Sequence, residues 1–235
     1  MLDKQYLSIR PYTASSISVN FNNLLVNKPW GSEYLMYNNP ESEIWNLYIS
    51  HQKSTSMHCH PNKKTALLVV EGRALFSTLN ESIELHPLDV VVMGPGIFHS
   101  TQAVSPEGLR VLEFESPPMK HDLLRLADKY GRVNSGYENK DAMTVDRKSI
   151  HFAKKNANKF KKIYDKKMGI AVVNNHSDIK KLAQGSMELA VLLSGSIKSG
   201  SIDKLFLFPY AITIEELENL DCSFRNVSMF VVGRI

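Results

Sequence analysis

Between residues 28 and 115, short apolar runs alternate with polar turn residues at a spacing typical of β strands. Turn-forming groups such as Pro95-Gly96 separate these runs. Because no helical period lies between them, the pattern predicts a β sandwich or barrel. The runs are Tyr34–Tyr37, Ile44–Ile49, Ala66–Val70, Ala74–Leu79, Val90–Met93 and Leu109–Phe114.

A helical pattern first occurs at residues 122–130, where apolar positions precede Gly131, a residue typical of a helix end. Residues 1–27 are weakly patterned, and we expect an N-terminal arm there. Residues 139–167 are polar and rich in lysine and arginine, which predicts a basic linker with a solvated helix face. The alternative for this stretch is binding of an acidic or phosphorylated partner.

The remaining residues, 168–235, contain further strand-like runs and predict a second, smaller β unit. These runs are Gly169–Val173, Leu189–Leu193, Leu205–Phe208 and Ser228–Val232. We therefore expect four parts: the arm, a β domain over 28–138, the basic linker over 139–167, and the second β unit.

The composition is that of a folded soluble protein, with 43% hydrophobic and 22% charged residues among 235. A net charge of +4 is too small to indicate a nucleic-acid partner. No apolar run approaches the roughly 18 residues needed to cross a membrane, and the first residues lack a signal-peptide pattern. The two cysteines, Cys59 and Cys222, lie far apart in the sequence. A reduced, cytoplasmic protein is expected.

Three histidines carry the most specific chemistry. His58 and His60 are two residues apart in a β-like stretch, so their side chains project from the same face of a strand. His99 follows the Pro95-Gly96 turn and can reach that face from a neighbouring strand. Three imidazoles that converge inside a barrel form a site for one divalent first-row metal ion, and we expect Zn, Mn, Ni or Fe.

Four sequence blocks, taken in order, resemble the cupin superfamily. The closest likeness is to the cupin domain of type II mannose-6-phosphate isomerases and related bacterial proteins of sugar metabolism and polysaccharide biosynthesis. The resemblance implies an all-β double-stranded β-helix, or jelly-roll, barrel. The blocks are Lys28-Pro29-Trp30-Gly31, Ser56-Met57-His58-Cys59-His60 running into Val69-Val70-Glu71-Gly72, Pro95-Gly96-Ile97-Phe98-His99, and 125–132.

The chain departs from the family pattern at one metal ligand. The first cupin block normally places a glutamate four residues after its second histidine, and here Thr65 stands at that position. The resemblance therefore implies three neutral imidazoles, with water, Gln102 or substrate in the remaining position. Without the carboxylate, the site keeps more positive charge and favours an anionic substrate.

The second half resembles a degraded cupin repeat. Residues 190–195 echo 68–72, whereas Phe208-Pro209-Tyr210 lies where a repeat with metal would carry its histidine turn. The expected fold class is thus an all-β bicupin, whose second, degenerate unit has no metal site.

Further candidates surround the predicted barrel mouth. Lys63 and Lys64 follow the histidine pair and can hold a phosphate or carboxylate. Arg110 and Glu113 alternate with apolar residues on a late strand, so we expect both to face the interior. We assign Glu113 and Lys64 to the catalytic set, with Glu113 as general base. The candidate substrate-binding residues are Lys63, Arg110, Arg125, Arg132, Trp30 and Tyr34; the alternative for each is an exposed or core position.

The leading hypothesis is a metal-dependent enzyme that isomerises or epimerises a sugar phosphate or nucleotide sugar. A ferrous dioxygenase or lyase that acts on a small anionic substrate is the second hypothesis. A non-catalytic sugar-binding cupin is the third. A homodimer is expected because cupins that resemble this chain pair through edge strands.

Overall fold

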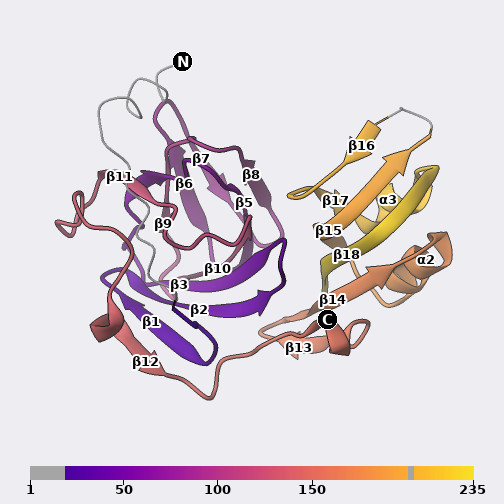
Figure 1. The fold of residues 1–235 in the computed structure, drawn as a ribbon, viewed down its shortest axis with the longest axis horizontal. Coiled ribbons are helices and arrows are strands. Elements are labelled where there is room, and N and C mark those ends of the chain that lie inside the picture. The colour runs from indigo at the N-terminus through magenta and orange to yellow at the C-terminus, as the bar shows by residue number, and fades with distance from the viewer. Residues whose placement is uncertain (1–18, 201–203) are drawn as a thin grey trace. The chain divides into compact units, whose positions relative to one another are not determined.

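The computed structural model describes residues 19–200 and 204–235 (Figure 1). The chain divides into two compact units, with the boundary between His151 and Phe152. Each unit has a hydrophobic core of its own. No helix among the described residues is long and apolar enough to span a membrane.

Unit 1 consists of two antiparallel sheets. The seven-stranded sheet has the order β12-β1-β2-β3-β10-β5-β8, and the five-stranded sheet has the order β11-β4-β9-β6-β7. The first contains Leu24–Lys28 (β1), Gly31–Asn38 (β2), Glu43–Ile49 (β3), Lys64–Glu71 (β5), Val90–Met93 (β8), Leu109–Ser116 (β10) and Met143–Val145 (β12). The second contains Met57–Cys59 (β4), Ala74–Thr78 (β6), Ser82–Leu85 (β7), His99–Ala103 (β9) and Leu124–Ala127 (β11).

From β3 to β12 the chain passes back and forth between these two sheets. β3, β5, β8, β10 and β12 belong to one sheet, and the elements between them belong to the other. This winding is that of a double-stranded β-helix (Figure 1). The predicted barrel and all six predicted strand runs of this unit are confirmed.

The interior of unit 1 is apolar in one part and polar in another. Apolar side chains at alternating strand positions form the core, as Trp45, Leu47 and Ile49 do on β3. Each large side chain buried in this way contributes about 1.5–3 kcal/mol to stability. Histidine, lysine and glutamate side chains occupy the polar part, where the candidate site lies.

One sequence prediction for unit 1 is wrong. The helix expected at 122–130 is strand β11, because pairing with β4 satisfies its backbone and outweighs the helical spacing. The arm expected at 1–27 includes strand β1, which pairs with β2 and β12. Residues 1–18 lie outside the described residues.

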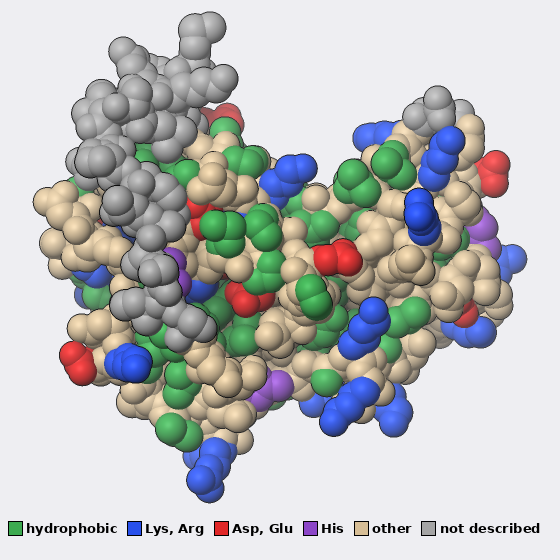
Figure 2. Space-filling model, viewed as in Figure 1, with side chains coloured by type: hydrophobic (Ala, Val, Ile, Leu, Met, Phe, Trp, Pro, Cys, Tyr) green, Lys and Arg blue, Asp and Glu red, His purple; other side chains and the backbone are tan. Residues whose placement is uncertain are grey.

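The basic linker expected at 139–167 is also corrected. It is divided between the units and contains the 3₁₀ turns η1 (Lys140–Ala142) and η2 (Lys154–Asn156), strand β12, and strand β13 (Lys161–Ile163). β13 is an edge strand of unit 2, and its residues Lys161 and Lys162 are exposed. Figure 2 shows many lysine and arginine side chains on the face of the molecule that it draws. Exposed lysines on an edge strand discourage pairing with a further strand, which accounts for the charge without a helix.

Unit 2 is a second β-rich unit, as the expected fold class requires. Its six-stranded sheet has the order β13-β14-β18-β15-β16, with β17 also paired to β15. Where unit 1 has two facing sheets, the described residues of unit 2 form one sheet and two α-helices. The elements are Lys166–Val173 (β14), His176–Gln184 (α2), Leu189–Ser199 (β15), Lys204–Phe206 (β16), Ala211–Thr213 (β17), Ile214–Asn219 (α3) and Cys222–Arg234 (β18).

Neither helix of unit 2 was predicted from the sequence. The capping box of α3 was available as a signal, because Thr213 accepts from the backbone of Glu216 and the Glu216 side chain accepts from that of Thr213. α2 is capped by Asn175, and its inward residues Ile179 and Leu182 are buried.

Candidate metal centre and pocket

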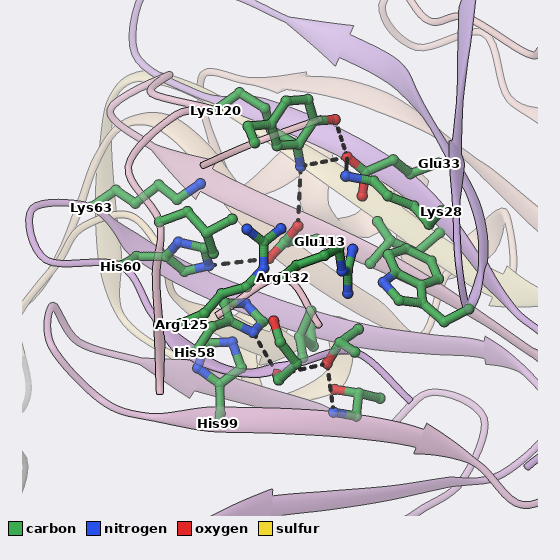
Figure 3. A pocket seen from close by; sticks show the side chains of 18 residues that line it. Lys28, Glu33, His58, His60, Lys63, His99, Glu113, Lys120, Arg125 and Arg132 are labelled. Atoms are coloured by element: carbon green, nitrogen blue, oxygen red, sulfur yellow. Dashed lines mark hydrogen bonds and ion pairs between the residues drawn. The ribbon is translucent and has the colours of Figure 1, made fainter. Parts of the chain in front are cut away.

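The three histidines converge in the polar interior of unit 1 (Figure 3). His58 on β4 and His99 on β9 are direct cross-strand partners, and His60 follows β4 on the same face. The ring centroids are 4.5 Å apart for His58 and His99, 5.0 Å for His58 and His60, and 5.6 Å for His60 and His99. One nitrogen from each ring lies within 4.8 Å of the others, which is close enough to hold a single metal ion.

Hydrogen bonds fix the protonation of each ring. The Nδ1 atoms of His58, His60 and His99 lie 2.8, 2.6 and 3.0 Å from backbone carbonyl oxygens, which belong to Ser56, Asp122 and Ile97 respectively. Because a carbonyl oxygen only accepts, each Nδ1 carries the proton and donates it. Each Nε2 is then left with its lone pair, as a metal ligand requires. The Nε2 of His60 is buried and has no hydrogen-bond partner, so the residues present fit a divalent ion.

Burial keeps the His58 and His99 imidazoles neutral. It lowers the pKa of His58 well below its ordinary value, and the neighbouring histidines lower it further. Burial, together with His60, lowers the pKa of His99 to about 4. Neutral imidazoles at neutral pH are ready to bind a metal ion without first losing a proton.

Glu113 on β10 brings a carboxylate to this centre, as the sequence predicted. Its Oε1 lies 3.6 Å from Nε2 of His60, and its Oε2 lies 3.4 Å from Nζ of Lys120. Burial by itself raises the pKa of Glu113, but the positive charges of Lys120 and Lys63 help to lower it well below the ordinary value. The carboxylate is therefore ionised.

Lys120 links three carboxylates. Its Nζ lies 3.3 Å from Glu33, 3.4 Å from Glu113 and 3.0 Å from Glu115, and 3.9 Å from the ring centroid of Trp45. Burial lowers the pKa of Lys120, but the three carboxylates raise it well above the ordinary value. A buried charge is tolerated only when it is paired, and here the pairing fixes the position of Glu113.

The pocket in front of the histidines contains about 560 Å³ of atom-free space, part of it open to solvent. Five cationic side chains and two carboxylates line it, together with the three histidines. The cations are Lys28, Lys63, Lys120, Arg125 and Arg132, and the carboxylates are Glu33 and Glu113.

Five of the proposed catalytic and substrate-binding residues line this pocket: Lys63, Trp30, Glu113, Arg125 and Arg132. Three others do not. Lys64 is exposed, because successive residues of a strand point to opposite faces and Lys63 points inward. Arg110 pairs with Glu71 at 3.1 Å and lies over the ring of Tyr48. Tyr34 packs edge-to-face against His151.

Thr65, which stands where the cupin family normally has a glutamate ligand, is also not among the residues that line the pocket. Thr65 is buried, and its cross-strand partners are Glu115 and Met93. Gln102, considered as a substitute ligand, alternates with the inward residues His99 and Thr101 on β9 and lines a different groove. The carboxylate nearest the histidines comes instead from Glu113 on β10.

Sequence reasoning missed several polar residues of the pocket, among them Lys28, Glu33, Lys120 and Tyr137. Lys28 begins the Trp30 block at the end of β1, and Glu33 follows the block on β2. Charged residues on inward strand positions were an available signal. Lys120 and Tyr137 lie in loops, where no periodicity reveals the direction of a side chain.

No family model matches this chain, and no curated protein matches it. Solved structures do. KdgF from Halomonas sp. is 18% identical over 38% of this chain and 82% of KdgF, with a TM-score of 0.35. A Klebsiella pneumoniae protein with a double-stranded β-helix domain is 16% identical over 51% of this chain and 98% of its own, with a TM-score of 0.37. The capsular polysaccharide assembling protein CapF from Staphylococcus aureus is 20% identical over 45% of this chain, with a TM-score of 0.40, and the match spans 34% of CapF.

Unit 1 has the cupin fold. The assignment rests on the winding of its two sheets and on the order of its sequence blocks. The similarities to solved structures are likenesses of fold and carry no information about activity.

Proposed function

We propose that this protein is a metal-dependent cupin enzyme that isomerises or epimerises a sugar phosphate or nucleotide sugar. The observation that carries the proposal is the place of Glu113. Its ionised carboxylate lies beside His60 and in the same pocket as the three convergent histidines. A proton acceptor next to a Lewis-acid site is what proton transfer at a carbon beside a carbonyl needs.

Each group has a distinct part in this reaction. His58, His60 and His99 would hold one divalent ion, which when bound polarises a carbonyl or hydroxyl oxygen of the sugar. Glu113 takes the proton from the adjacent carbon and, in an isomerisation, returns it to a neighbouring atom on the same face. In an epimerisation a second acid supplies the proton on the opposite face. Lys120 holds Glu113 in position and stabilises negative charge that develops on the substrate.

The charge of the pocket supports an anionic substrate. Cations outnumber carboxylates among the lining residues, and the histidine ligands add no negative charge that would offset the charge of a divalent ion. A phosphate or carboxylate group entering this pocket exchanges its hydration for charge-assisted hydrogen bonds.

The test combines metal analysis of the purified protein with a screen of sugar phosphates and nucleotide sugars. On the substrate found, Glu113→Gln should lower kcat by about 10²- to 10⁴-fold and abolish exchange of the substrate hydrogen with deuterated solvent. Its metal content should stay at the wild-type level. Glu84→Gln, which alters an exposed carboxylate, is the matched control and should have wild-type activity. Full activity of Glu113→Gln would refute the assignment.

One observation favours a second candidate. The histidines form a ligand group without a carboxylate, a set that also suits ferrous iron. Bound iron together with oxygen uptake would identify a dioxygenase, and cleavage without oxygen uptake would identify a lyase. Tight sugar binding that survives replacement of the histidines, without turnover, would identify a non-catalytic module.

A further inference from the structure

Three cationic side chains of the pocket converge on one carboxylate, that of Glu138. Nη1 of Arg132 lies 2.7 Å from Oε1 of Glu138, and Nη2 of Arg125 lies 3.6 Å from the same oxygen. Nζ of Lys28 donates to Oε2. The Lys28 and Arg125 side chains are 4% and 3% exposed, Glu138 is 9% exposed, and Arg132 is 15% exposed.

These cations are also lining residues of the pocket that contains the histidines. Lys28, Arg125 and Arg132 all line it, and Figure 3 shows the two guanidinium groups inside the pocket, between the histidines and Lys28. Burial raises the pKa of Glu138, but Lys28 and Arg125 lower it by more, so the carboxylate is charged. A ready-made anion site therefore exists beside the candidate metal centre, and a side chain of the protein fills it.

We infer that the Glu138 carboxylate stands in for the anionic group of the substrate, and that an entering phosphate or carboxylate replaces it on Lys28, Arg125 and Arg132. The sugar part of this substrate rests on the proposed function. The exchange of anions does not.

Each cation has a second partner that holds it when Glu138 leaves. Nη1 of Arg125 donates to the backbone carbonyls of Ser135 at 2.6 Å and Gly136 at 2.5 Å. The Arg132 guanidinium also pairs with Asp128 at 2.8 Å. A site whose donors are already fixed loses little conformational entropy when an anion binds.

Lys28 is anchored in the same way. Its Nζ lies 3.2 Å from Glu33 and 3.8 Å from the ring centroid of Tyr137. All three cations therefore keep their positions without Glu138. A carboxylate that served only to organise these side chains would not need such duplicate anchors.

Glu138 itself belongs to a loop. It follows β11 and precedes η1, in a stretch without strand pairing. The backbone of this loop is held to Arg125 through the carbonyls of Ser135 and Gly136. The Glu138 side chain can therefore leave by rotation about its own bonds, while the loop and the three cations stay in place.

The exchange predicts that Glu138 competes with external anions. Glu138→Gln keeps the shape and hydrogen-bonding capacity of the side chain and removes its charge. Inorganic phosphate, titrated into the protein by calorimetry at constant ionic strength, should bind about tenfold more tightly to Glu138→Gln than to the wild type. Glu84→Gln, which removes the charge of an exposed carboxylate paired with Arg73, should bind phosphate as the wild type does.

Thermal unfolding separates competition from a loss of structure. Phosphate should raise the Tm of Glu138→Gln by more than it raises that of the wild type. A ligand of the folded state at free concentration L stabilises it by RT ln(1 + L/Kd), which is larger for the tighter binder. If Glu138→Gln does not fold, Glu138→Asp tests the inference instead. The aspartate side chain is shorter, so its carboxylate lies farther from the three cations while it keeps its negative charge. Phosphate should then bind Glu138→Asp more tightly than the wild type.

Equal or weaker phosphate binding by the folded variant overturns the inference, and so does the absence of phosphate binding in all forms. These measurements involve no turnover. Failure of the isomerase assay would therefore leave the anion exchange standing, and failure of the phosphate titration would leave the roles of the histidines and Glu113 untouched.

Discussion

His58 and His99 are direct cross-strand partners on β4 and β9, and this single register pair brings two imidazoles to a centroid distance of 4.5 Å. A slip of one residue would turn one of these rings to the opposite face of the sheet. The candidate metal centre thus depends on the pairing of two short strands. His60, two residues after His58, completes the group.

Replacement of one ring should remove the ion. We expect the wild type to retain one divalent ion, and His99→Ala to bind it at least about a hundredfold more weakly, because two imidazoles cannot enclose it. Metal content after dialysis against a weak chelator gives the measurement. His86→Ala is the control, since His86 is exposed and lies outside the centre. Equal retention by His99→Ala and wild type would show that the group holds no ion.

Loss of Lys120 should destabilise unit 1. Lys120→Met leaves Glu33, Glu113 and Glu115 buried without their shared cation, and we expect a loss of about 3–5 kcal/mol in the free energy of unfolding. Arg73→Met breaks the exposed pair with Glu84 and should cost about 1 kcal/mol or less. Denaturant unfolding of the metal-free proteins measures both, and similar values for the two variants would contradict the prediction.

The same ion pairs predict a pH dependence. The pKa of Glu113 is lowered in the folded state, so its stabilising contribution is complete above its ordinary value of 4.5 and is lost as pH falls through the lower folded pKa. The pKa of Lys120 is raised, so its contribution is complete below 10.5 and is lost as pH rises through the higher folded pKa. The stability difference between wild type and Lys120→Met should therefore be largest between about neutral pH and pH 10. It should shrink in acid, as the carboxylates are protonated, and in stronger alkali, as Lys120 loses its proton. A difference that does not change with pH would argue against the ionised state of the network.

Unit 2 should fold by itself. Its core cluster contains only residues from 160 onward, so residues 152–235 carry all the apolar groups that form it. We expect this fragment to unfold cooperatively, as followed by circular dichroism. A fragment over 168–235 lacks β13 and Phe160, which packs on the core, and should be less stable. Equal stability of the two fragments would place the boundary near 168, where the sequence alone put it.

Gly31 should not tolerate a side chain. Its φ is +151°, and a Cβ would lie 2.0 Å from the backbone oxygen of Tyr48. Gly31→Ala should cost at least about 2 kcal/mol in the free energy of unfolding, and the nearby Trp30 wall of the pocket should shift with it. Gly94→Ala, whose Cβ would meet nothing within 4 Å, should stay within about 0.5 kcal/mol of the wild type.

The sequence determined the features that depend on local alternation. Strands β2, β3, β5, β6, β8 and β10 follow directly from apolar runs between turn residues. The same-face placement of His58 and His60 follows from their spacing of two, and the arrival of His99 follows from the turn at Pro95-Gly96. These predictions succeed because the period of a strand is set by its own backbone.

The tertiary structure decided which polar residues face the pocket. Lys63 is inside and Lys64 outside, although the two are neighbours of identical type, because only the register of β5 fixes which of them points inward. Residues 124–127 carry a helical spacing yet form a strand, because the unpaired edge of β4 offers backbone hydrogen bonds that a helix there would leave unmade.

No local sequence pattern could predict that Lys28, Arg125 and Glu138 meet. Lys28, Arg125 and Glu138 come from a strand near the beginning of unit 1, from a strand near its end, and from the loop beyond it. No period connects positions that are separated by about a hundred residues. Their meeting depends on how the two sheets close around the interior, and long-range pairing of this kind is specified by the packing of the whole unit and not by any one segment.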